Sequence, residues 1–224
     1  MKIRLVHILT DIEAEREQAS VSSLAPVARF GIEYVQSINV PYVGEKWRAQ
    51  KNWANDIYPD HSQRHYGAFH SFRKAVLMNY EPVLDALILC ECDCILTVTA
   101  KEFSEQVFKA VEFCEVNSLS YYTFGSNECS PVYYVDKDRP HSYITDKIIC
   151  AHCVMFPNRE RSFLLSEIAH RPWETPDVWF NMVFHTRGPS RFGAMYNPIA
   201  KQHPGYSLID NEWKDNKYDE KTYL

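Results

Sequence analysis

The first 38 residues alternate between strand-like and helix-like patterns, and this alternation constrains the fold more than any other feature. Residues 3–10 form an apolar, β-branched run that is typical of a buried strand. Residues 14–30 carry apolar side chains at helical spacing, and Pro26 either starts a new turn or interrupts the helix. Residues 32–38 alternate like a second strand. A strand, a helix and a strand in about 35 residues predict a βαβ unit with parallel strands.

The remaining chain extends this alternation and then becomes richer in strands. Helical spacing returns at residues 65–80 and 101–117, and a strand is predicted between them at 85–91. The sequence therefore predicts a doubly wound α/β sheet, mostly parallel and flanked by helices, in a single domain over residues 1–224. The other predicted elements are strands at 121–124, 132–135 and 147–156, short helices at 162–170 and 176–184, and a loop with short strands at 191–210.

Composition excludes several classes of function. The formal net charge of -5, with scattered basic residues, argues against nucleic acid as the main partner. Residues 1–9 lack a signal-peptide pattern, and the chain has no run of about 18 apolar residues that could span a membrane. Action at a membrane would therefore be peripheral. Seven cysteines without secretory features favour reduced thiols and a cytoplasmic location.

The segment at residues 87–96 contains the strongest functional signal. Residues 87–90 are apolar, as expected for a strand buried on both faces, and Glu91 and Asp93 follow directly. On an extended chain two residues so spaced share one face, about 6.5–7 Å apart at Cα, and their carboxylates repel unless a cation joins them. Ligands of open α/β sheets bind beyond the carboxyl ends of the strands. A divalent cation that bridges a diphosphate is therefore predicted, against the alternative of two acids making surface hydrogen bonds.

Two blocks together resemble a known family: His65-Tyr-Gly-Ala-Phe-His-Ser-Phe-Arg-Lys-Ala75 and Leu87-Ile-Leu-Cys-Glu-Cys-Asp-Cys-Ile-Leu96. The pattern is similar to glycosyltransferase family 25, of the lipopolysaccharide type, and to related sugar transferases of marine bacteria and phages. Weaker similarity extends to residues 151–157, 176–179 and 198–203.

This resemblance implies a GT-A-like, Rossmann-like fold and transfer of a sugar from a nucleotide-sugar donor to an acceptor hydroxyl. The favoured donor is a UDP-sugar, the acceptor is a glycan or a lipopolysaccharide-like molecule, and the cofactor is Mn²⁺ or Mg²⁺. Residues 1–100 would form the nucleotide-sugar-binding half and residues 101–224 the acceptor-binding half. Asp93 falls on the metal-binding position, with Glu91 as the weaker ligand. Cys92 and Cys94 depart from the family pattern.

Five residues are candidates for donor binding in the first half. Thr10 and Asp11 end the first strand, where a carboxylate can accept hydrogen bonds from ribose hydroxyls; the alternative for Asp11 is a helix N-cap. His65 and Gly67 are expected at the start of a helix, where free N–H groups favour anions. Arg73, further along that helix, could meet a phosphate, although exposed basic residues are more often only solvated.

Three further candidates lie in the second half of the chain. Asp177 is expected at a helix start and could deprotonate the acceptor hydroxyl, or be an ordinary acidic residue of a first turn. Gln202 is a donor-binding candidate in a late loop. His203, next to it, could complete the metal site or remain a surface residue.

The cysteines are predicted to be structural. Cys90, Cys92 and Cys94 are expected on one face of a strand, and Cys150 and Cys153 have the spacing of a zinc-binding pair. Three thiols along one strand cannot converge on a single ion without a turn, however. Core packing is therefore the predicted role, because buried free cysteine behaves as a small hydrophobic side chain.

Two other functions remain open on the sequence. A nucleotidyltransferase could use the same acids for metal-assisted phosphoryl chemistry, but it usually brings a Gly-rich and basic loop, which residues 10–16 lack. A non-catalytic sugar-binding module on a transferase fold is the second alternative. Such a module would bind no complex of metal and nucleotide.

Overall fold

The computed structural model describes most of the chain, and everything stated below refers to that part. The described residues are 1–10, 14–38, 59–125, 128–129, 132–135, 142–145, 148–149, 152–170, 176–186, 192–195, 197–207 and 212–214.

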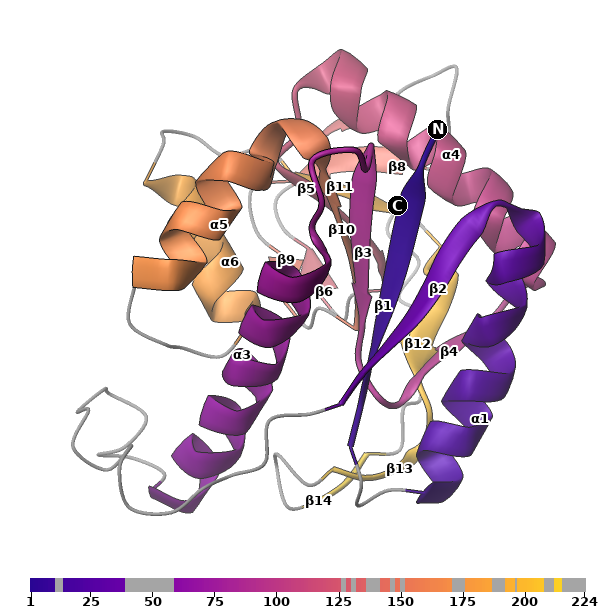
Figure 1. Ribbon diagram of the computed structural model, residues 1–224, viewed down its shortest axis with the longest axis vertical. Helices are drawn as coiled ribbons and strands as arrows, with labels where there is room; N and C mark the ends of the chain where they lie inside the picture. The colour runs from indigo at the N-terminus through magenta and orange to yellow at the C-terminus, as the bar shows by residue number, and fades with distance from the viewer. Residues whose placement is uncertain are drawn as a thin grey trace.

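An eight-stranded sheet with the order β2-β1-β3-β10-β5-β11-β8-β7 forms the centre of the molecule (Figure 1). Only β10 and β8 run antiparallel to their neighbours, so the other six strands share one direction. The predicted βαβ unit and the mostly parallel sheet are therefore confirmed. The strands are β1 (Ile3–Leu9), β2 (Ile32–Ile38), β3 (Ala86–Cys90), β5 (Tyr121–Gly125), β7 (Val132–Val135), β8 (Ser142–Thr145), β10 (Cys153–Pro157) and β11 (Phe192–Met195).

Helices cover both faces of this sheet (Figure 1). Successive β3 residues alternate between two hydrophobic clusters, with Ile88 and Cys90 in one and Leu87 and Leu89 in the other. The apolar run of β3 is thus explained by burial on both faces. One face carries α1 (Ala14–Leu24), the 3₁₀ helix η1 (Ala25–Phe30) and α4 (Ala100–Asn117); the other carries α3 (Pro59–Asn79), α5 (Arg161–His170) and α6 (Pro176–His185), with the 3₁₀ turn η3 (Asn158–Glu160) before α5.

Three two-stranded sheets complete the described structure. Figure 1 shows β4 and β12 side by side, between the central strands and α1. This small sheet can lie close against β5 because Gly125 lacks a Cβ, which would overlap the carbonyl oxygen of Ala200. The pairs are β4 (Cys94–Leu96) with β12 (Ala200–Gln202), β13 (Gly205–Ser207) with β14 (Glu212–Lys214), and β6 (Glu128–Cys129) with β9 (Ile148–Ile149).

The start of α3 differs from the prediction. The helix begins at Pro59, about two turns before the expected start at His65, so His65 and Gly67 lie inside it. Proline is favoured at the first position of a helix because its missing N–H has no partner to lose there. Apolar periodicity is weak between residues 59 and 65, which is why the pattern placed the start too late.

The second half differs from the prediction in two places. Residues 147–156 form two strands, β9 and β10, in different sheets instead of one continuous strand. Residues 192–195 form β11, a central strand of the main sheet, where a loop with short strands was expected. Four residues are too few to display a clear period of two, so the pattern did not separate β11 from its surroundings.

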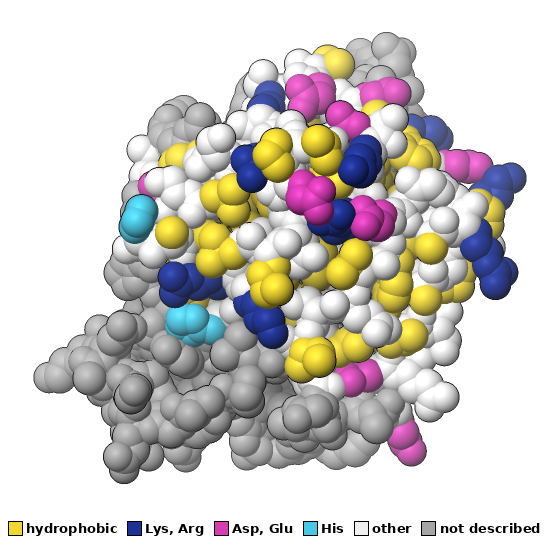
Figure 2. All heavy atoms as spheres, viewed as in Figure 1, with side chains coloured by type: hydrophobic (Ala, Val, Ile, Leu, Met, Phe, Trp, Pro, Cys, Tyr) yellow, Lys and Arg dark blue, Asp and Glu magenta, His cyan; other side chains and the backbone are white. Residues whose placement is uncertain are grey.

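Charged and apolar side chains are intermixed on the surface. On the face shown in Figure 2, basic and acidic side chains are interspersed with hydrophobic ones. Arg4, for example, forms ion pairs with Glu33 and Glu81 at 2.9 and 2.7 Å. Within the described part of the chain, no helix has the length and apolar character needed to cross a bilayer.

Candidate functional site

A tight turn after β3 presents the two acidic residues. The Cys94 N–H donates to the Glu91 carbonyl at 3.1 Å, and β4 begins at Cys94. The Glu91 N–H still donates to the His152 carbonyl at 3.0 Å, as part of the β3–β10 pairing. The expectation that Glu91 and Asp93 share one face of an extended strand is therefore wrong. Because the chain reverses between them, their side chains take different partners.

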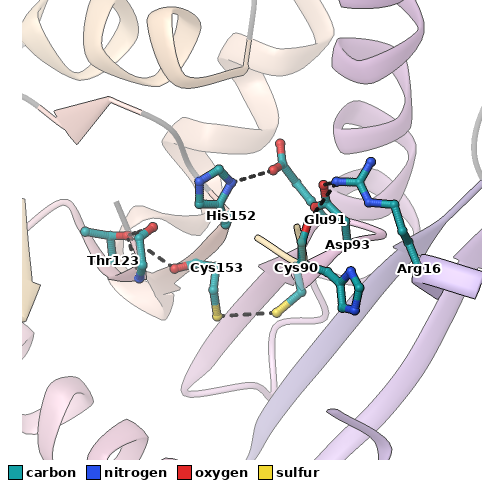
Figure 3. Close-up of polar contacts among 9 residues, drawn as sticks. Arg16, Cys90, Glu91, Asp93, Thr123, His152 and Cys153 are labelled. Atoms are coloured by element: carbon teal, nitrogen blue, oxygen red, sulfur yellow. Dashed lines mark hydrogen bonds and ion pairs between the residues drawn. The ribbon is translucent and has the colours of Figure 1, made fainter. Parts of the chain in front are cut away.

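Asp93 is buried and faces a cation from another element. Its side chain is 9% exposed, and Oδ2 accepts a hydrogen bond from Arg16 Nη2 at 2.5 Å (Figure 3). Arg16 lies in the first turn of α1, just beyond the carboxyl end of β1. Asp93 Oδ1 is also buried and has no hydrogen-bond partner among the described residues. Asp93 thus uses one carboxylate oxygen to bind the Arg16 cation, and its other oxygen is available to a further ligand.

The environment of Asp93 makes its carboxyl group responsive near neutral pH. Burial and the neighbouring charge of Glu91 raise the pKa of Asp93 to about 7, against the lowering effects of His152 and Arg16. A further cation at Oδ1 would favour the ionised form and would compete with the proton.

Glu91 pairs with His152 on the other side of the turn. The imidazole Nδ1 of His152 lies 2.8 Å from Glu91 Oε2, and His152 is almost completely buried (Figure 3). Burial lowers the pKa of His152, but the hydrogen bond to Glu91 and nearby acids raise it overall. His152 Nε2 is buried without a partner among the described residues. Each acid of the turn is thus paired with a base from another segment, Asp93 with Arg16 and Glu91 with His152.

His203 is placed beside Asp93 by the small sheet. Gln202 on β12 pairs with Cys94 on β4, and the next N–H, that of His203, donates to the Asp93 carbonyl at 2.6 Å. The Arg16 guanidinium also donates to the His203 carbonyl, at 3.2 Å. The ring Nδ1 of His203 donates to the Pro204 carbonyl at 2.8 Å, which leaves Nε2 as the unprotonated nitrogen of the neutral ring.

Thr10 lies at the same edge of the sheet. Its backbone N–H donates to Glu17, and its Oγ1 is buried without a partner among the described residues. Asp11 lies outside the described residues. Because β1 and β3 are parallel neighbours, Thr10 and the turn after β3 follow strand ends at one edge.

The other predicted residues are not joined to this site. Gly67 lies within α3, where its carbonyl accepts the Ser71 hydroxyl at 2.7 Å, so it offers no free helix terminus. Among the described residues, no hydrogen bond or ion pair links Gly67 or Arg73 to the turn. His65 is inside α3 and Asp177 is the second residue of α6, and both side chains lie outside the described part. Their predicted roles stay predictions.

Arg16 and His152 are functional candidates that sequence reasoning missed. One feature could have identified Arg16: it follows the first strand, and from the first turn of the next helix it can reach the carboxyl edge of the sheet. For His152 the only such feature was its place between two cysteines. Its contact with Glu91, 61 positions away, could not be predicted from local sequence.

The residues at the turn include ligands that a divalent cation could use. Asp93 Oδ1, just before β4, is a hard donor, and His203 Nε2, just after β12, is a borderline one. Among the described residues, only one group of three such side chains, Cys90, Cys94 and Cys153, brings its ligand atoms within 4.8 Å of one another, so a cation at the turn would have to draw its ligands closer together. Glu91 could add an oxygen, although its Oε2 is already engaged by His152. The carboxylate oxygens suit Mn²⁺ and Mg²⁺, whereas the imidazole is a softer ligand than either ion prefers.

A hollow of about 750 Å³ lies at the opposite edge of the sheet. Met1 and Asp85, which precede β1 and β3, line it together with Arg159 and residues of α4. Its position at the amino ends of the strands separates it from the acidic turn. Ligands of open α/β sheets bind at the carboxyl edge, so the turn remains the better candidate.

Comparisons with known proteins add little beyond these observations. No protein-family model matches the chain, and no curated protein matches it. Among solved structures, a glycosyltransferase involved in glycosylation of the major capsid of PBCV-1 is 13% identical, with 87% of this chain and 81% of that chain covered and a TM-score of 0.48. The apo form of a UDP-glucose pyrophosphorylase is 10% identical, with coverage of 87% and 90% and a TM-score of 0.45. No functional residue is transferred to this chain from either protein.

Proposed function

We propose that this chain is a divalent-metal-dependent glycosyltransferase of GT-A-like fold, which moves a sugar from a nucleotide-sugar donor to an acceptor hydroxyl. The observation that carries the proposal is the buried Asp93 carboxylate, with one oxygen unpartnered and the other held by Arg16. A carboxylate and a guanidinium at the carboxyl edge of parallel strands suit a cation and a diphosphate side by side. The resemblance to family 25 in the two sequence blocks supports the same reading.

In this proposal Asp93 is the principal ligand of Mn²⁺ or Mg²⁺, with His203 and Glu91 as further ligands. The metal would supply charge neutralisation for a departing nucleoside diphosphate. Arg16 can donate two parallel hydrogen bonds to a phosphate, because its guanidinium is planar and always charged. Its pairing with Asp93 places it next to the carboxylate that would hold the metal.

The remaining roles complete the proposal. Thr10 Oγ1, buried and without a partner among the described residues, would contact the donor at the end of β1 together with Asp11. Gln202 would contact the donor from β12, and Asp177 on α6 would accept the proton of the acceptor hydroxyl. A UDP-sugar is the first donor to test.

A thermal-shift screen of UDP-, GDP- and CDP-sugars, with and without Mn²⁺, tests this proposal directly. We expect one donor class to raise the melting temperature only with the metal, and to be hydrolysed slowly to nucleoside diphosphate. Asp93→Asn should lose the metal-dependent shift, whereas the control Glu105→Gln, an exposed carboxylate on α4, should keep it. Asparagine keeps the size of the side chain and an oxygen that can accept from Arg16, so the fold should be kept.

Three results would contradict the proposal. Release of pyrophosphate instead of nucleoside diphosphate would identify a nucleotidyltransferase. Metal-free sugar binding without turnover would identify a binding module. Normal turnover by Asp93→Asn would remove Asp93 from the metal site.

A further inference from the structure

Three buried thiols converge directly behind the acidic turn. Cys90, Cys94 and Cys153 are each fully buried, and their sulfur atoms all lie within 4.8 Å of one another. The Cys90 and Cys153 sulfurs are 3.3 Å apart. Figure 3 shows these two sulfurs pointing toward each other, away from the contact between His152 and Glu91.

The fold brings them together from three strands. Cys90 ends β3 and is paired in register with Cys153, the first residue of β10. The turn then folds Cys94, at the start of β4, back beside them. The predicted arrangement of three thiols along one strand is therefore wrong. The turn removes the steric objection to a shared ion, and Cys92 and Cys150 are not needed for it.

The size of the cluster suits a metal ion. An equilateral triangle with sides between 3.3 and 4.8 Å has its centre about 1.9 to 2.8 Å from each corner. A zinc–thiolate bond of about 2.3 Å falls within that interval. The sulfurs thus surround a point at bonding distance without any rearrangement of the strands.

We propose that Cys90, Cys94 and Cys153 bind one thiophilic cation, Zn²⁺ or Cu⁺, as thiolates. Soft sulfur ligands select these ions over Mn²⁺ and Mg²⁺, so this site is chemically separate from the oxygen-rich site at Asp93. No fourth His, Cys, Asp or Glu of the described residues joins the group at this spacing. Zn²⁺ therefore needs a further ligand such as water, whereas Cu⁺ is satisfied by three thiolates.

The ion would connect the strands that carry the acidic turn. It would tie β4 to β3 and β10. In this way it would hold Asp93 in place, including the carbonyl that accepts the His203 N–H. Because the thiols are fully buried, entry of the ion requires local opening of the surrounding structure, and binding should be slow. This role is independent of the proposed transferase activity, and its test needs no nucleotide.

The test is metal uptake by the reduced full-length chain, measured by dialysis and elemental analysis. One arm uses Zn²⁺ and a second, anaerobic arm uses Cu⁺. We expect one ion per chain in at least one arm, and an affinity that falls at least tenfold in Cys94→Ser. Cys92→Ser is the matched control, because Cys92 lies in the same turn outside the cluster, and its affinity should be unchanged.

X-ray absorption of the loaded wild-type chain makes the result independent of how the variants fold. It should show sulfur neighbours at about 2.3 Å, three per ion, for zinc. Coordination by nitrogen and oxygen only, an equal loss in Cys92→Ser, or no uptake in either arm would overturn the proposal. A Cys90–Cys153 disulfide in protein isolated without reductant, with no uptake after its reduction, would overturn it as well.

Discussion

The guanidinium of Arg16 and the carboxylate of Asp93 form an ion pair between residues 77 positions apart, with Nη2 2.5 Å from Oδ2. Both side chains are nearly buried, at 12% and 9% exposure. The pair links the first turn of α1, after β1, to the turn after β3. Two adjacent parallel strands therefore present opposite charges at the same edge of the sheet.

Replacing Arg16 should weaken donor binding more than it weakens the fold. Arg16→Met removes a charge that lowers the pKa of Asp93, so this pKa should rise from its value of about 7. It also removes the proposed phosphate contact, and we expect affinity for the donor to fall about tenfold or more. Calorimetric titration of the donor with Mn²⁺ measures this. Arg16→Lys should recover part of the affinity, and Lys101→Met, an exposed change on α4, should have no effect. Full donor affinity in Arg16→Met would exclude the phosphate role.

Coupling between Glu91 and His152 should depend on pH. The pKa of His152 is raised in the folded state, so its stabilising contribution is complete at low pH and is lost as pH rises through that raised pKa. A double-mutant cycle with Glu91→Gln and His152→Asn should give a coupling energy of about 1–2 kcal/mol at pH 6. The same cycle at pH 9 should give a smaller value, measured by urea unfolding. Equal coupling at both pH values would mean that the pair is a neutral hydrogen bond.

His7 should make the protein sensitive to mild acid. It is buried between the Tyr34 hydroxyl at 2.8 Å and the Ser20 hydroxyl at 2.9 Å. Burial lowers the pKa of His7 to about 4, whereas the unfolded chain takes up this proton near its ordinary value of 6.5. Stability from this group is therefore present above pH 6.5 and is lost as pH falls toward 4, by up to about 3 kcal/mol.

The comparison of wild type with His7→Gln isolates this effect. Glutamine keeps a donor and an acceptor for Tyr34 and Ser20 but does not titrate in this range. Urea unfolding at pH 7, 5.5 and 4.5 should show the wild type losing more stability than the variant. Parallel losses in both proteins would show that other groups govern acid unfolding.

Sequence patterns located the elements whose burial has a clear period. β1, β2, the region of α1 and η1, and α4 lie where the spacing of apolar residues placed them. The apolar run at residues 87–90 also predicted β3 correctly, because both faces of this strand are buried.

The site was harder to predict because it depends on a turn and on long-range pairs. The turn from Glu91 to Cys94 contains no glycine or proline, so the sequence there did not indicate that the chain reverses direction. Arg16 meets Asp93, and His152 meets Glu91, only because distant strands become neighbours in the sheet. Side-chain spacing along a sequence reports which face is buried, but not which strand will lie beside it.

Gly125 offers a way to disturb the site without touching its charged groups. It ends β5 opposite β12, where an added Cβ would overlap the carbonyl oxygen of Ala200. The backbone nearby is held by the Ile199 N–H, which donates to the Phe124 carbonyl at 2.9 Å. Gly125→Ala should therefore push β12 away and destabilise the protein by about 1–3 kcal/mol.

The same shift should weaken metal and donor binding, because β12 leads directly to His203 and its hydrogen bond to the Asp93 carbonyl. Urea unfolding and donor titration with Mn²⁺ measure the two effects on one preparation. Ser162→Ala, an exposed change on α5, is the control and should leave both unchanged. If Gly125→Ala loses stability but keeps full donor affinity, then β12 does not position the site, and the role of His203 as a ligand loses its structural basis.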